Sequence, residues 1–88
     1  MRDHLAHHSA LLRQWESKVR EIDTGTSEML NRRLTTTPPA DRRRTVSFKR
    51  FAYEGLIARA EAEIAWANRG LRLADELYGP EQAAQEQA

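Results

Sequence analysis

The sequence has no cysteine and few turn-forming residues, with 4 glycines and 3 prolines among 88 residues. Without cysteine there is no disulfide framework, thiolate metal site or cysteine nucleophile, and we expect a cytoplasmic protein. Barrels and sandwiches need more turns than these residues supply, which favours helices. No purely apolar run exceeds four residues, so we expect no association with a membrane.

The sequence has almost no excess charge of either sign, because its formal net charge is +1. The distribution is uneven: residues 1–30 carry −1, residues 31–50 carry +6 and residues 51–88 carry −4. The basic stretch could contact phosphates, but it contains only one aromatic residue, Phe48, and the total charge lacks the long-range attraction of a dedicated DNA-binding protein. We interpret it as a solvated or partner-pairing segment.

Apolar residues recur at alternating spacings of three and four over residues 3–23, a pattern that predicts a helix with a coiled-coil seam. Asp3 is a candidate N-cap, and Gly25 is suited to the left-handed conformation at a helix end. About three heptads are too short to be stable alone in water, so this helix must pack against another. The seam consists of Leu5, His8, Leu12, Trp15, Val19 and Ile22.

A much longer helix is expected over residues 42–78, with Asp41 as its N-cap, and it carries two apolar stripes. The first stripe comprises Val46, Tyr53, Ile57, Ala60, Ile64, Ala67, Leu71, Ala74 and Tyr78. The second stripe comprises Phe48, Ala52, Leu56, Trp66, Gly70, Leu73 and Leu77. One short helix can cover only one stripe. We therefore expect an all-α fold, an antiparallel helical hairpin with one long second helix, that assembles as a helical homodimer.

Residues 1–80 are expected to form one helical dimerisation domain. Between the two main helices we expect a short helix over residues 26–34 and an extended linker over residues 35–41, because the adjacent prolines Pro38 and Pro39 disfavour helix. Residues 81–88 have no apolar side chain larger than alanine and are predicted to be a disordered tail.

The candidate dimer interface takes residues from both main helices. Gly55 and Gly70 each weaken a helix interior by about 1 kcal/mol relative to alanine, which favours close approach of a neighbouring helix at those points. The residues expected in the interface are Leu5, Leu12, Trp15, Val19, Ile57, Ile64, Trp66, Ala67 and Leu71.

No arrangement of polar residues in the sequence predicts catalysis. His4 and His8 lie one helical turn apart and could supply two metal ligands, but a site needs at least a third, and no such partner is evident. The carboxylates do not converge, and no serine has a neighbouring base. We therefore expect no enzyme activity, no metal site and no cofactor.

Trp15 and Trp66 are the largest apolar side chains, and each lies on or beside an apolar stripe. Each can bury on the order of 200 Å² in a core or an interface, which is the default interpretation. The alternative is that they form a shelf for a planar aromatic ligand bound between subunits.

The two main helices resemble a known family. Residues 53–66 read YEGLIARAEAEIAW, and residues 5–15 read LAHHSALLRQW. These segments are similar to the C-terminal domain of PadR-type transcriptional regulators of the virulence activator alpha subfamily, in which a helix of the type G-x-x-x-x-x-A-E-x-x-W follows a variable loop. The likeness extends over about residues 2–78, and its most specific part is Ala60-Glu61 with Trp66.

The resemblance implies a homodimerisation domain that holds two DNA-reading winged helix-turn-helix heads for a palindromic operator. Such a head is not contained in these 88 residues, so contact with DNA is expected only through a separate N-terminal domain. Two alternatives stay open. One is an effector-sensing domain that binds a planar aromatic ligand near Trp15 and Trp66, and the other is a small adaptor that binds a partner through residues 32–50.

Overall fold

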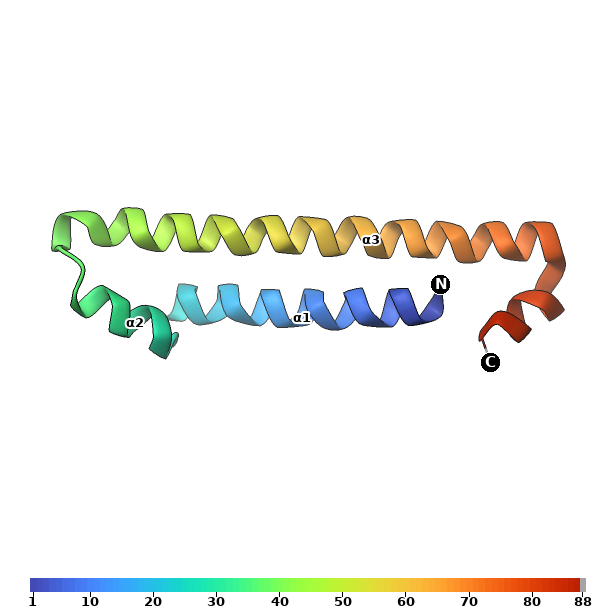
Figure 1. Ribbon diagram of the computed structural model, residues 1–88, viewed down its shortest axis with the longest axis horizontal. Coiled ribbons are helices and arrows are strands. Elements are labelled where there is room, and N and C mark those ends of the chain that lie inside the picture. The colour runs from blue at the N-terminus through green and yellow to red at the C-terminus, as the bar shows by residue number, and fades with distance from the viewer. Residues whose placement is uncertain (88) are drawn as a thin grey trace.

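The computed structural model describes the backbone of residues 1–87 and the side chains of residues 1–79. It contains α1 (Arg2–Thr24), α2 (Glu28–Thr35) and α3 (Pro39–Gln87), and α1 runs antiparallel to α3 (Figure 1). The all-α prediction is confirmed, since no strand occurs in residues 1–87. None of the described helices is both long and apolar enough to cross a bilayer. The expected disordered tail, residues 81–88, falls outside the described side chains and stays a prediction.

Helix α1 ends at a glycine cap. Gly25 adopts φ 70° and ψ 21°, and the amides of Gly25 and Thr26 donate to the carbonyls of Ile22 and Glu21 at 3.2 and 2.8 Å. Only glycine takes this left-handed conformation at little cost. At the other end, Met1 occupies the N-cap position and Asp3 lies in the first turn. Asp3 therefore favours the helix through its charge and not as the cap that the sequence suggested.

The connection between α2 and α3 is shorter than expected. The Ser27 hydroxyl accepts from the Leu30 amide at 3.3 Å, so α2 begins at Glu28. The prediction of an extended linker over residues 35–41 is wrong, because α2 continues to Thr35 and α3 begins at Pro39. A proline needs no amide partner in the first turn, and its φ suits a helix. Asp41 consequently lies in the first turn of α3 and is not its N-cap.

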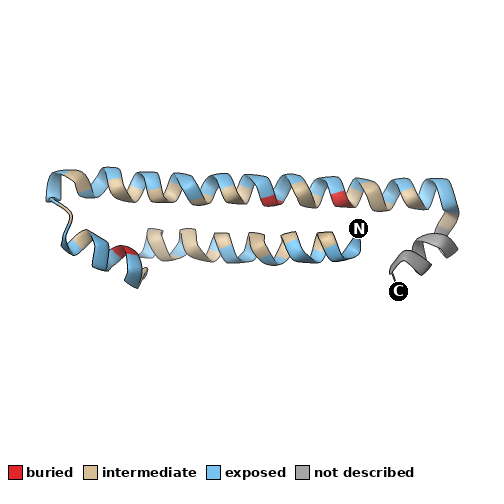
Figure 2. Cartoon of the chain, in the orientation of Figure 1, coloured by how far each residue is buried: buried red, intermediate tan, exposed pale blue. Residues whose placement is uncertain are grey.

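The core is the seam between α1 and the first stripe of α3. Ala67 is completely buried and Ala60 is 3% exposed, while most of the larger apolar residues of the seam are half-buried (Figure 2). Leu30 of α2 is the remaining buried apolar residue among the described side chains. Alanine at the centre of the first stripe lets α1 approach α3 closely. The hairpin thus has a narrow core one layer thick.

A polar contact joins the C-terminal end of α1 to α3. Arg50 Nε donates to Asp23 Oδ1 at 2.9 Å, and the Arg50 guanidinium also pairs with Glu54 on its own helix. The hydrogen bond from Arg50 lowers the pKa of Asp23, and the same bond raises the pKa of Arg50. Both side chains face solvent, so their contribution to stability is small and sensitive to salt.

The hairpin is too extended for a compact monomer. Its longest dimension is 60 Å and its radius of gyration is 18.9 Å, where a compact chain of this length has about 12 Å. Its accessible surface is 6740 Å², whereas a globular monomer of this mass exposes about 5,300 Å². Helix α1 is roughly 35 Å long, and α3 extends for about 60 Å before Gly79 interrupts it with φ 81°. Much of α3 therefore has no covering helix.

Replacing Ala67 by leucine tests the seam. The added side chain has no space between α1 and α3, so Ala67→Leu is expected to lower the free energy of unfolding by about 1–3 kcal/mol. Ala65→Leu is the matched control: Ala65 is exposed on the same helix, and its change should stay within about 0.5 kcal/mol. Urea unfolding at a fixed chain concentration measures both. Equal effects of the two substitutions would contradict the described seam.

The Asp23–Arg50 pair predicts a small pH dependence. Because the hydrogen bond from Arg50 holds the pKa of Asp23 in the folded chain below its ordinary value of about 3.9, ionised Asp23 stabilises the fold above that value. This stabilisation is lost as the pH falls through the folded pKa. Asp23→Asn should therefore show a smaller loss of melting temperature than the wild type between about pH 5 and about pH 3. Parallel melting curves for the two proteins would contradict the role of this pair.

Candidate functional site

The exposed apolar surface of α3 is the most prominent feature of the molecule. Phe48, Phe51 and Leu77 are each about two-thirds exposed, and Trp66 and Leu73 are about half exposed. At 100° per residue, most of these positions lie roughly 120° around α3 from the stripe that packs on α1. We define the outer face of α3 as the strip formed by Phe48, Ala52, Gly55, Arg59, Trp66, Gly70, Leu73 and Leu77.

Large side chains of the outer face line two hollows on α3. Towards α2, Phe48 and Phe51 line a shallow apolar hollow with Arg44 and Ser47. Towards the other end, Trp66 and Leu73 line a second hollow that also includes Met1, Arg69 and Gly70. The Met1 side chain covers Gly70, since a Cβ added there would lie 3.0 Å from Met1 Cε.

Small side chains lie between the large ones along this part of α3. A Cβ added at Gly55 meets nothing within 4 Å, and Ala52 and Ala62 are exposed. Glycine in an exposed helix interior is unfavourable by about 1 kcal/mol relative to alanine, and nothing within this chain compensates for it at Gly55. Close approach of another backbone at Gly55 would compensate for this cost.

Eight of the nine residues predicted for the dimer interface are used by the hairpin seam within one chain. Ala67 is fully buried, and the other seven are half-buried on the facing sides of α1 and α3: Leu5, Leu12, Trp15, Val19, Ile57, Ile64 and Leu71. Trp66 is the one member of the set whose side chain is exposed. Phe51, which is not in that set, lies beside the second stripe and is 69% exposed.

The two tryptophans do not share a site within one chain. Trp15 stacks at a tilt on Tyr53, with ring centroids 5.9 Å apart, whereas Trp66 contacts His4 at 5.4 Å. Tyr53 and Trp66 are separated by about 20 Å along α3. A cavity of about 380 Å³ lies beside Tyr53 at the junction of the three helices, and its lining includes Lys18, Arg33 and Lys49 but neither tryptophan. Ligand binding near Trp15 and Trp66 stays a prediction.

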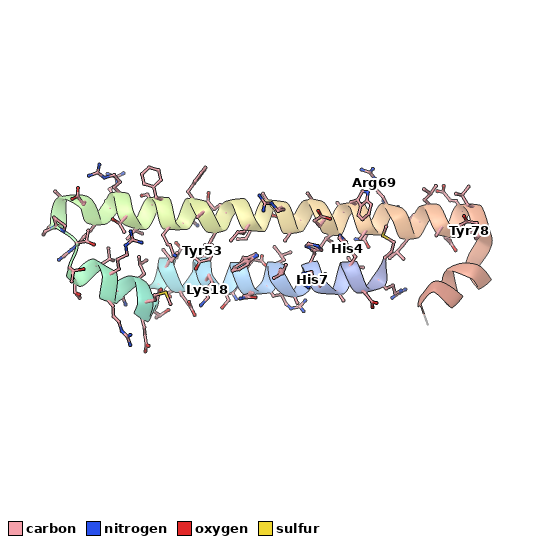
Figure 3. All side chains as sticks on the ribbon, viewed as in Figure 1. His4, His7, Lys18, Tyr53, Arg69 and Tyr78 are labelled. Carbon is pink, nitrogen blue, oxygen red and sulfur yellow. The ribbon has the colours of Figure 1, made fainter. Side chains whose placement is uncertain are left out.

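The hairpin brings a carboxylate to the pair of histidines on α1. His4 Nε2 and Glu63 Oε2 are 2.7 Å apart, and the His4 and His8 ring centroids are 4.4 Å apart. One ligand atom from each of His4, His8 and Glu63 lies within 4.8 Å of the other two, and all three residues are half-buried. Figure 3 shows His4 between α1 and α3 and His7 on α1. The expectation of no metal site rested on a missing third ligand, which the register of the hairpin supplies.

The chain matches no family model, and a search of curated proteins finds no relative. Its function must therefore be inferred from the outer face of α3 and from the cluster of His4, His8 and Glu63. The first is an extended apolar surface, suited to contact with a macromolecule. The second is a compact set of donor atoms, suited to an ion.

Proposed function

We propose that this chain is a homodimerisation domain that pairs through the outer face of α3. The supporting observation is the row of large apolar side chains exposed on that face, in a chain whose total accessible surface is roughly 1,400 Å² larger than that of a globular monomer of its mass. A standard interface buries about 800 Å² per partner, so one interface on this face has enough surface available. Large apolar side chains exposed on one strip are typical of a surface that another protein covers.

A second copy of the chain is the occupant that the spacing favours. Starting at Phe48, successive residues of the outer face are separated by 4, 3, 4, 7, 4, 3 and 4 positions, a series that reads the same in both directions. A two-fold axis beside Ala62 and Glu63 would pair two such helices in antiparallel orientation, and every position would meet a position of the same face. Self-complementarity of this kind is the requirement of a two-fold symmetric interface.

This axis would place each residue of the outer face opposite one residue of the partner's outer face. Phe48 would lie opposite Leu77 of the partner subunit, and Ala52 would lie opposite Leu73 of the partner subunit. Gly55 would lie opposite the partner's Gly70, and the absence of a side chain at Gly55 would leave room for the Met1 side chain that covers Gly70 within each chain. Arg59 would lie against the partner's Trp66, an arrangement in which a guanidinium over an indole contributes about 0.5–2 kcal/mol.

The dimer that we propose is an antiparallel four-helix assembly. The two α3 helices form its centre, and each α1 covers its own α3 on another side. Each end of the interface then has a large apolar pair, Phe48 with Leu77. Smaller residues lie further in, and Arg59 with the partner's Trp66 lies on each side of the axis. This arrangement is consistent with helix packing at an axial separation of about 8–10 Å.

We further propose that the domain serves a PadR-like transcriptional regulator by holding two DNA-reading domains at a fixed spacing. This rests on the similarity of residues 5–15 and 53–66 to that family's C-terminal domain, and on the proposed dimer. DNA contact would belong to the winged helix-turn-helix and not to this domain. The alternatives are an effector-sensing domain with an aromatic ligand near Trp15 and Trp66, and a partner-binding adaptor.

Cross-linking of single cysteine variants tests the antiparallel dimer, because the native chain has no cysteine to interfere. Ala62 lies beside the proposed axis, so Ala62→Cys should give a disulfide-linked dimer under mild oxidation. Ala52→Cys alone should not cross-link, since the two copies of position 52 would be about 30 Å apart. A mixture of Ala52→Cys and Leu73→Cys chains should form the mixed dimer. Non-reducing electrophoresis measures all three.

Ala65→Cys is the control for random collision, because Ala65 is exposed on the same helix but away from the outer face. A parallel dimer would show efficient cross-linking of Ala52→Cys with itself, which would contradict the geometry. No cross-linking of Ala62→Cys above the level of Ala65→Cys would contradict pairing through this face.

Because the proposal assigns DNA contact to a winged helix-turn-helix domain, we expect that this chain alone does not bind DNA. A mobility-shift assay with mixed-sequence duplex DNA at low salt should show no retardation at micromolar chain concentrations. Retardation that disappears as the salt concentration rises would instead support an adaptor acting through the basic residues 32–50.

A further inference from the structure

We propose that His4, His8 and Glu63 form a binding site for a divalent transition-metal ion of the zinc class. The site does not depend on the proposed dimer, because all three ligands come from one chain. His4 and His8 are one turn apart on α1, which places both imidazoles on the same side of that helix. Glu63 comes from α3, so a bound ion would connect the N-terminal turns of α1 to the middle of α3.

The distances suit a bound ion after small side-chain rotations. Zinc bonds to imidazole nitrogen and carboxylate oxygen are about 2.0–2.2 Å long, which places the ligand atoms of a tetrahedral site about 3.3 Å apart. The three ligand atoms here already lie within 4.8 Å of one another, with the His4–Glu63 pair at 2.7 Å. Rotation about side-chain bonds can supply the difference, and the helices need not move.

The donor set selects the class of metal. Two imidazoles and one carboxylate suit zinc, cobalt or nickel, whereas calcium and magnesium prefer oxygen ligands alone. Three protein ligands leave a fourth tetrahedral position for water or another small ligand. Half-burial of all three residues leaves the ion a route from solvent.

The surroundings restrict the ligand rings. Trp66 packs edge-on against His4 at 5.4 Å between ring centroids, and His7 packs edge-on against His8 at 5.0 Å. These contacts reduce the number of conformations that binding must select, which favours affinity.

Titration calorimetry with zinc chloride tests the site directly in the full chain at about pH 7.5. We expect one zinc ion per chain for the wild type. His8→Ala and Glu63→Gln should each weaken binding by more than about tenfold, because loss of a supporting contact alone already weakens metal sites by 10–100-fold. Glu63→Gln keeps an oxygen that can accept a hydrogen bond from His4, so the hairpin should keep its fold.

The chain offers a matched control for each ligand. His7→Ala removes an exposed imidazole beside His8, and Glu61→Gln removes an exposed carboxylate two residues from Glu63. Glu61→Gln should bind zinc as the wild type does, whereas His7→Ala, which removes only the ring packed against His8, should weaken binding much less than His8→Ala does. Circular dichroism of each variant separates loss of a ligand from loss of the fold.

A melting curve gives a second readout. At a zinc concentration about 100-fold above the dissociation constant, the wild type should melt at least about 5 °C higher than without zinc, and Glu63→Gln should not. If the folded wild type binds no zinc at about 100 µM zinc, the proposal is overturned. Equal affinity of the wild type, His8→Ala and Glu63→Gln would also overturn it.

Discussion

Helix α3 carries two apolar faces, and the chain folds only one helix of substantial length against it. The first stripe packs on α1, with Ala60 and Ala67 buried at its centre. The outer face keeps Phe48, Trp66 and Leu77 in contact with water, although each could bury apolar surface worth about 25 cal/mol per Å². This imbalance explains the thin core, the long shape and the large accessible surface, and it is the physical reason for proposing a second copy.

Periodicity in the sequence was enough to predict the helices and the two stripes of α3. It could not say which partner each stripe meets, because heptad spacing describes a face and not its neighbour. The sequence pattern therefore places Ile57 and Ile64 in the dimer interface, whereas in the structure they pack in the seam of the hairpin. Pro39 shows a similar limit at the local level: paired prolines indicate a break in helix, but the second proline can equally begin the next helix.

The cluster of His4, His8 and Glu63 shows what only the register of the hairpin can supply. The spacing of the two histidines is visible in the sequence, whereas Glu63 is 59 residues away from His4 and reaches it only because α1 and α3 are antiparallel. The same register brings Met1 over Gly70 and Asp23 to Arg50. Glu63 also lies next to the proposed two-fold axis, so the middle of α3 would take part in both the ion site and the dimer centre.

We propose that the foldable unit consists of two chains that pair through the outer face of α3. Sedimentation equilibrium of the 88-residue chain measures this most directly, because one chain has a mass of 10.1 kDa. For the proposed dimer we expect a mass of about twice that value at micromolar concentrations. We expect a single-chain mass when Trp66 is replaced by aspartate. A folded wild-type chain that remains at 10.1 kDa up to the highest concentration reached would contradict it.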